Sequence, residues 1–203
     1  MTWIVLAMAV LVVVVQLSSV IGIEYYQNAR NAKLRSSLTP GQQNSKNLVV
    51  YFSRSGNTEL MAFKIAQMKN ALLLNLIAKD YEIGLKGWVN AMMDARKTTA
   101  VISPRKIDLS RFDTIYIGAP IWLYSSAPPA FEFVKQNDFT GKKVILFNSL
   151  NSKFEQKYIN DFTRLVAQNG GQLIKHIYIV RGRMTGQIST QAFLDTVETR
   201  MRQ

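Results

Sequence analysis

A serine-rich segment after an apolar run of the chain has the composition of a phosphate-binding loop. It reads Ser53, Arg54, Ser55, Gly56, Asn57 and Thr58. It joins an expected strand to an expected helix, so free backbone N–H groups and the positive helix end point at one place. It has neither a Gly-Lys-Ser/Thr sequence nor an acidic residue for magnesium, which favours holding a phosphate monoester over transferring a phosphoryl group. The alternative is a capped strand–helix turn that binds no ligand.

Two further segments lie where ligand-contacting loops are expected. The first contains Pro120, Ile121, Trp122, Leu123 and Tyr124, which places two large aromatic rings in one connection. A planar heteroaromatic ligand could stack on Trp122, and the alternative is that Trp122 packs beneath its own loop. The second segment is small and polar and could hydrogen-bond to the edge of a ring; it contains Asn148, Ser149 and Asn151.

The composition narrows the chemistry that the chain can perform unaided. It has no cysteine and one histidine, which excludes thiol nucleophiles, thiolate metal sites, iron–sulfur clusters and histidine-cluster metal sites. We predict no catalytic residue and no metal ligand, so redox chemistry would have to come from an organic cofactor. The 25 Lys and Arg residues give a net charge of +12, but they are scattered and accompany no nucleic-acid-binding motif. We therefore expect no nucleic-acid partner.

Several residues that invite a functional interpretation are better explained by structure. His176 lies inside an expected strand and is interpreted as a hydrogen-bonded strand residue. The basic residues around it are interpreted as solvated surface: Lys175, Arg181 and Arg183. Apolar residues at helical spacing are interpreted as core: Trp88, Met92 and Met93.

Apolar runs of strand length alternate with helical patterns through most of the chain. The expected strands cover 48–52, 71–78, 113–118, 143–147 and 173–180. One expected helix follows Thr58, and others cover 87–97, 128–137, 155–168 and 190–201. This alternation predicts an α/β fold with a parallel sheet and right-handed crossovers. Ligands bind such sheets at the carboxyl ends of the strands, where the three segments described above lie.

The first part of the chain predicts a membrane anchor. Residues 3–23 carry no charge, and at about 1.5 Å per residue they span about 31 Å, close to the thickness of a hydrocarbon core. A cleaved signal peptide and a buried core helix are the alternatives. Arg30, Lys33 and Arg35 follow the span, so the positive-inside tendency places the rest of the chain in the cytoplasm, with a single membrane pass.

A polar linker is expected between the anchor and the folded unit. Residues 24–46 are rich in Asn, Gln, Ser and basic residues and include the turn signal Pro40-Gly41. The folded unit is then 47–203, which is long enough for one hydrophobic core.

Two stretches of the sequence resemble the flavodoxin family. Residues 51–59 resemble the FMN-phosphate loop of flavodoxins, and Gly118-Ala119-Pro120-Ile121-Trp122 resembles the loop that contacts the isoalloxazine ring in short-chain members. The resemblance implies a five-stranded sheet of order 2-1-3-4-5 with FMN at the switch point between the first and third strands. It implies that the phosphate lies on 53–58 and the ring against Trp122. The basic charge of the chain and the missing aromatic residue in the loop after strand four depart from the family pattern.

These observations lead to one expected function and two alternatives. We expect a membrane-tethered, FMN-binding electron-transfer protein whose partner is a redox protein or a quinone. The first alternative is an FMN-dependent NAD(P)H or quinone oxidoreductase. The second is an interaction module of flavodoxin fold that has lost its cofactor.

Overall fold

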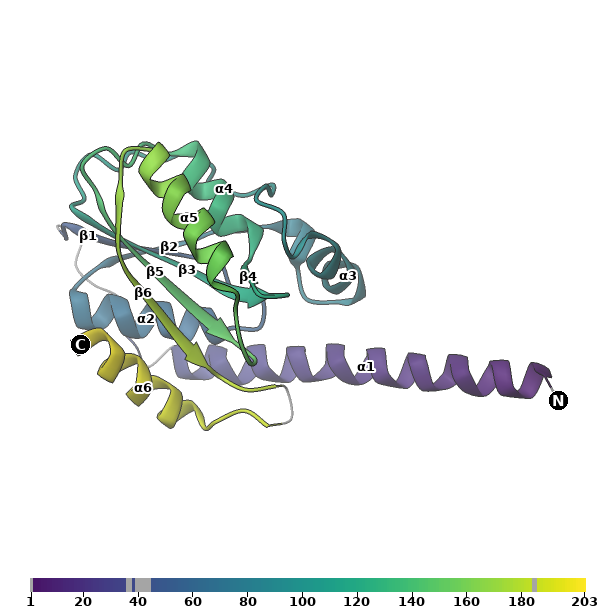
Figure 1. Ribbon diagram of the computed structural model, residues 1–203. Helices are drawn as coiled ribbons and strands as arrows, with labels where there is room; N and C mark the ends of the chain where they lie inside the picture. The colour runs from purple at the N-terminus through teal and green to yellow at the C-terminus, as the bar shows by residue number, and fades with distance from the viewer. Residues whose placement is uncertain (1, 36–37, 39–44, 184–185) are drawn as a thin grey trace.

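A parallel β-sheet between two layers of helices forms most of the structure (Figure 1), a computed structural model that describes residues 2–35, 38, 45–183 and 186–203. The strands are β1 (Asn47–Tyr51), β2 (Leu72–Asn75), β3 (Thr114–Trp122), β4 (Ser125–Ser126), β5 (Lys143–Leu150) and β6 (Gln172–Val180). The helices are α1 (Thr2–Arg35), α2 (Asn57–Lys69), α3 (Leu85–Asp94), α4 (Pro128–Gln136), α5 (Gln156–Gln168) and α6 (Thr190–Arg202), with a short 3-10 helix η1 (Lys79–Tyr81).

The sheet has the order β2-β1-β3-β5-β6, and these five strands are parallel to their neighbours. The expected total of five strands is corrected to six, because β4 pairs antiparallel with the end of β3. The turn between β3 and β4 holds Leu123 and Tyr124 at positive φ, 40° and 78°. Tight turns of this kind favour Gly or Asn, so two large residues gave no turn signal in the sequence.

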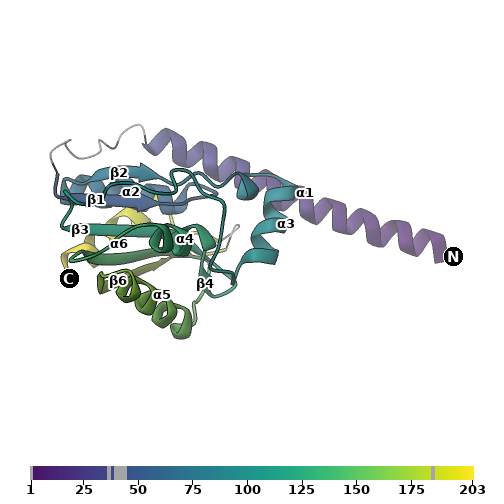
Figure 2. The ribbon, with the colours of Figure 1, turned by 90° about the horizontal axis from the view of Figure 1, so that it is seen from above.

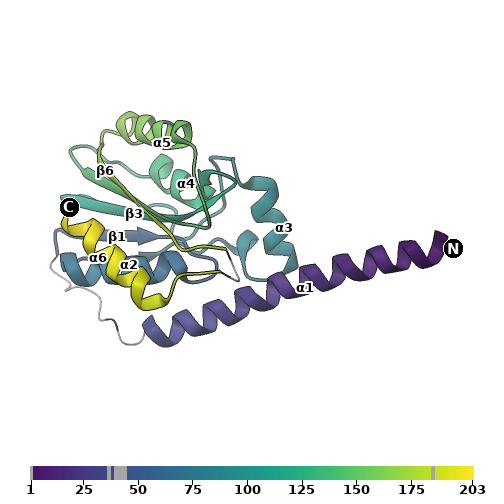
Figure 3. The same cartoon turned by 60° about the horizontal axis from the view of Figure 1, so that its bottom comes forward.

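The two faces of the sheet are covered by different helices. Helices α4 and α5 lie on one face, while α2, α6 and the C-terminal half of α1 lie on the other (Figures 1 and 3). Figure 2 shows α3 beyond the end of the sheet, beside α1. The carboxyl ends of the strands point toward the same side of the molecule as the free N-terminal half of α1.

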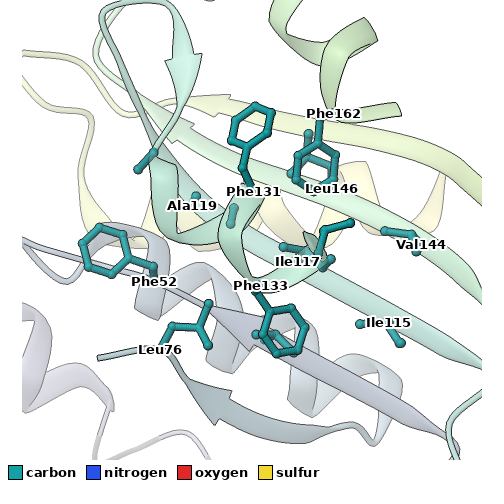
Figure 4. Packing of buried hydrophobic residues seen from close by; sticks show 14 of the residues in the cluster. Phe52, Leu76, Ile115, Ile117, Ala119, Phe131, Phe133, Val144, Leu146 and Phe162 are labelled. Atoms are coloured by element: carbon teal, nitrogen blue, oxygen red, sulfur yellow. The ribbon is translucent and has the colours of Figure 1, made fainter. Parts of the chain in front are cut away.

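Apolar side chains fill the space between the sheet and each helical layer. Figure 4 shows the layer under α4, where Phe131 and Phe133 pack onto Ile115, Ile117 and other strand residues. Within the sheet, a Cβ added to Gly118 would lie 2.1 Å from the ring of Phe147. Glycine is therefore required at this position by close approach of a neighbouring strand's side chain.

Helix α1 continues well past the expected anchor. Residues 24–35, expected as the start of a linker, are helical, and the rest of that linker, including Pro40-Gly41, is largely outside the described residues. Glu24, Gln27 and Asn31 recur at helical spacing and are 7%, 4% and 0% exposed. This stretch is buried through polar contacts, so an apolar periodicity could not identify it.

The N-terminal half of α1 has the length and composition of a membrane span. Its apolar window has a mean hydropathy of 2.8 and is 0% buried against the rest of the protein, so it is not part of the domain core. A secretory signal can have the same length and apolar composition, so membrane anchoring is a proposal for this helix.

Candidate functional site

The three segments singled out in the sequence line one cleft at the carboxyl edge of the sheet. The cleft holds about 770 Å³ of empty space, part of it open to solvent. Its lining includes Ser53, Arg54, Ser55, Asn57, Thr58, Pro120, Ile121, Trp122, Ser149 and Asn151. Four other predicted residues do not line it: Gly56, Leu123, Tyr124 and Asn148. Residues from α1, from α3 and from the segment after β6 complete the walls.

The loop 53–58 ends at the start of α2, as expected. Gly56 is the residue before the helix and has φ 84°, a left-handed conformation that side chains disfavour. Asn57 and Thr58 are buried in the first turn, where backbone N–H groups lack partners within the helix. The hydroxyl of Thr58 lies 2.7 Å from that of Ser149, which ties this loop to the end of β5.

Arg54 joins this loop to α1 and to the segment before α3. Its guanidinium forms a buried ion pair with Glu24 and donates to the carbonyl oxygens of Tyr81 at 3.2 Å and Gly84 at 3.1 Å. Burial lowers the pKa of Arg54, and the carboxylate of Glu24 opposes that shift. Glu24 itself lines the cleft, so α1 forms part of its wall. No motif in the sequence indicated this contact.

The aromatic part of the cleft combines the predicted loop with α3. Trp122 is half-buried and packs edge-on against Phe52 at 5.6 Å and Tyr81 at 5.2 Å, measured between ring centroids. The interpretation of Trp88 and Met92 as core is wrong, because both line the cleft. Met93, also interpreted as core, is 73% exposed.

A network of neutral hydrogen bonds joins strands β3, β4, β5 and β6 near their carboxyl ends. Asn148 donates to the carbonyl oxygen of Ala119 at 2.7 Å and to the hydroxyl of Ser126 at 3.1 Å. The Nε2 atom of His176 is 2.8 Å from the side-chain oxygen of Asn148. Burial lowers the pKa of His176 to about 4, so its imidazole is neutral at pH 7. The prediction that His176 is a hydrogen-bonded strand residue is confirmed.

Arg181 follows β6 and is corrected from solvated surface to a buried cleft residue. It is 1% exposed, and its guanidinium donates to the carbonyl oxygens of Ile188 and Ser189, each at 2.7 Å, and to the hydroxyl of Thr190 at 2.9 Å. Its Nε atom is buried without a partner. Its position directly after a strand at the carboxyl edge was the signal that could have identified it. Arg183 is exposed, as predicted.

Within the described part of the chain, no cluster of three or more His, Cys, Asp or Glu residues could hold a metal ion. The cleft therefore offers hydrogen-bond donors, aromatic rings and cations to a ligand. Such a set suits an anionic ligand that carries a planar ring.

Comparisons with known proteins agree with this architecture. Residues 46–178 match the family model described as Flavodoxin. No functionally curated protein matches the chain. Similar solved structures include a candidate flavoprotein from Bacteroides uniformis, 22% identical with a TM-score of 0.61, covering 81% of this chain and 100% of that one.

Two further solved structures share the fold. A candidate flavoprotein from Bacteroides eggerthii is 20% identical with a TM-score of 0.56, covering 76% of this chain and 99% of that one. A flavoprotein from Lactobacillus acidophilus, solved in complex with FMN, is 21% identical with a TM-score of 0.53, covering 69% of this chain and 93% of that one.

Proposed function

The chain belongs to the flavodoxin family, and from that premise we propose that it binds FMN in the carboxyl-edge cleft and transfers electrons while tethered to a membrane. The observation that carries the proposal is the meeting of the loop 53–58, the loop after β3 and the end of β5 in one cleft. The FMN complex of the similar Lactobacillus acidophilus flavoprotein supports the choice of ligand.

The residues of the cleft fit the chemical parts of FMN. The loop 53–58 and the first turn of α2 would hold the phosphate, because unpaired backbone N–H groups and hydroxyls gather there. Trp122 would contact the ring, and Ser149 and Asn151 would hydrogen-bond to its edge. The partnerless Nε atom of buried Arg181 supplies a further donor to the same cleft. FMN would supply the one- or two-electron chemistry that no side chain of this composition provides.

The tether is proposed from the position and direction of α1. The apolar half of this helix leaves the domain on the side where the strands end (Figures 1 and 3). Glu24, which lines the cleft, follows the uncharged span directly in sequence. The basic residues after the span favour a cytoplasmic domain. A quinone dissolved in the membrane or a membrane redox protein would then be the electron partner, since tethering raises the concentration of such partners.

The direct test is the flavin content of the full chain purified in detergent. We expect a yellow protein with flavin absorption, about one FMN per chain, and a higher melting temperature when FMN is added to the stripped protein. A colourless protein that neither binds added FMN nor gains melting temperature from it would contradict the proposal and favour a cofactor-free interaction module.

An FMN-dependent quinone reductase is the second candidate, and one contact favours it. Phe154, the first aromatic residue after β5, packs against His176 at 5.1 Å and Tyr178 at 4.8 Å and is absent from the cleft lining. No aromatic residue among Ser149, Leu150 and Asn151 covers this part of the cleft, which would leave room beside a flavin for a second substrate. Turnover of NADPH and a quinone by the FMN-loaded chain would support the reductase, and its absence with every donor would support a carrier.

A further inference from the structure

Two arginines near the loop 53–58, Arg181 buried and Arg30 half-buried, have no counter-charge among the described residues. Arg181 is buried beside the cleft, and the three hydrogen bonds that its guanidinium donates all go to neutral oxygen atoms. Arg30, on the C-terminal half of α1, donates from Nη2 to the side-chain oxygen of Gln187 at 3.1 Å, while its Nε atom is buried without a partner. In the part of the chain that the structure describes, no carboxylate pairs with either guanidinium.

The two guanidinium groups act on each other. Burial and the charge of Arg30 together lower the pKa of Arg181 to about 10. Two cations held close together, one of them buried and the other half-buried, are unfavourable unless an anion joins them. The Cζ atom of Arg181 lies 4.8 Å from the ring centre of Phe193, which offers only a weak substitute for a negative charge.

A buried asparagine fixes α1 in place beside the loop. Asn31 is 0% exposed, and its side-chain nitrogen donates to the carbonyl oxygen of Ser55 at 3.0 Å and to the side-chain oxygen of Asn57 at 3.1 Å. A Cβ added to Gly56 would lie 2.9 Å from the Cβ of Asn31, so the helix and the loop are in close contact. Because Arg30 is the neighbour of Asn31, this contact also fixes the position of Arg30.

We propose that Arg181 and Arg30 form a cationic seat for the phosphate monoester of the bound flavin nucleotide, which makes α1 part of the ligand site as well as a tether. The identity of the ligand rests on the proposed function, whereas the need for an anion rests on the two arginines alone. A phosphate monoester carries between one and two negative charges at pH 7 and accepts several hydrogen bonds, so it would neutralise both cations.

This seat adds selectivity that a loop of neutral donors lacks. Riboflavin has the same ring as FMN but no phosphate, so it gains nothing from the two arginines. The seat also couples ligand binding to the docking of α1, because an anion that stabilises the docked helix must be bound more tightly when the helix is docked.

The experiment compares FMN and riboflavin binding to the stripped full chain in detergent micelles. We expect Arg181→Met and Arg30→Met each to weaken FMN binding roughly 10- to 100-fold while leaving riboflavin affinity unchanged. Lys33→Met is the matched control, since it removes one charge from an exposed position of the same helix and should change neither affinity. If FMN and riboflavin affinities fall together, or neither falls, the proposal is wrong and the arginines are structural.

A second measurement separates this proposal from the proposed function. Inorganic phosphate should raise the melting temperature of the stripped chain, and Arg30→Met should abolish that rise. Arg181→Lys keeps the charge and should retain part of the preference for FMN, which keeps the test available should Arg181→Met fail to fold. If phosphate raises the melting temperature but the chain binds no flavin, the proposed flavin-binding function is wrong and the anion site at the two arginines stands. If the chain binds flavin and every variant keeps its preference for FMN over riboflavin, the proposed function stands and the phosphate site at the two arginines is wrong.

Discussion

Two groups of cleft residues are held in place by different interactions. The charged set, Glu24, Arg54 and Arg181, comes from three elements far apart in the chain, and an ion pair and bonds to backbone carbonyls hold it. The aromatic set consists of Trp88 and Trp122, and ring packing against Phe52 and Tyr81 holds Trp122 in place. This cleft would therefore recognise charge through side chains that the fold brings together from distant elements, and a planar ring chiefly through the loop that contains Trp122.

The largest effect that would test this comparison is removal of the Glu24 carboxylate. Glu24→Ala leaves Arg54 buried with only carbonyl partners, which should lower the free energy of unfolding by about 3–5 kcal/mol. Asp161→Ala is the control, because its ion pair with Arg164 is exposed and should contribute less than about 1 kcal/mol. Chemical denaturation of the full chain measures both. Equal effects of the two substitutions would show that α1 is not part of the folded unit.

Acidification should destabilise the folded chain through the hydrogen-bond network of Asn148 and His176. The pKa of His176 is about 4 when folded and near 6.5 when unfolded, so below pH 6.5 the unfolded chain binds the proton first. Stability should be complete above pH 6.5 and fall by up to about 3 kcal/mol as the pH approaches 4. The chain has one histidine, so His176→Gln should remove the part of this loss between pH 6.5 and 5. Identical pH profiles for the two proteins would argue against a buried neutral imidazole.

The smallest of the three effects is the loss of flavin affinity on removing Trp122, and it distinguishes the aromatic set from the arginines because FMN and riboflavin share a ring but not a phosphate. Trp122→Ala should weaken FMN and riboflavin equally, by about 1–3 kcal/mol, because it removes a stacking surface that both rings share. The variants of Arg181 and Arg30 should weaken the binding of FMN alone. Comparing them with Trp122→Ala therefore separates recognition of the phosphate from recognition of the ring. Tyr178→Ala, which removes an exposed aromatic ring outside the cleft, is the control for general loss of stability. Unchanged flavin affinity would show that the ring does not lie on Trp122.

The order of elements was predictable because it depends on local patterns. Runs such as 48–52 and 143–147 are buried on both faces, and such strands read as continuous apolar runs. Strand β4 was missed, because Leu123 and Tyr124 adopt positive φ without being Gly or Asn. The C-terminal half of α1 was missed for a related reason, since polar rather than apolar side chains bury it.

The site residues were predictable where a recognisable motif and the ligand-contacting side chains lie in the same short segment. The loop 53–58 and Trp122 line the cleft as expected, since each follows a strand that ends at the same edge of the sheet. Glu24 could not be assigned in this way, because its partner Arg54 is distant in sequence. Arg181 directly follows a strand at this edge but carried no motif, and its side-chain hydrogen bonds go to residues only seven to nine positions later. A basic residue just after a strand is usually solvated, and only the assembled fold buries this arginine.

Helix α1 runs without a break from Thr2 to Arg35, which would fix the mechanical relation of the domain to the proposed anchor. Arg30 lies seven positions after Ile23, a rise of only about 10 Å along the helix axis. A domain on a flexible tether sweeps through a wide volume, whereas this one would keep a fixed height and tilt above the bilayer. Partners would then reach it chiefly by lateral diffusion in the membrane plane, and a bulky soluble partner could approach only from the flank.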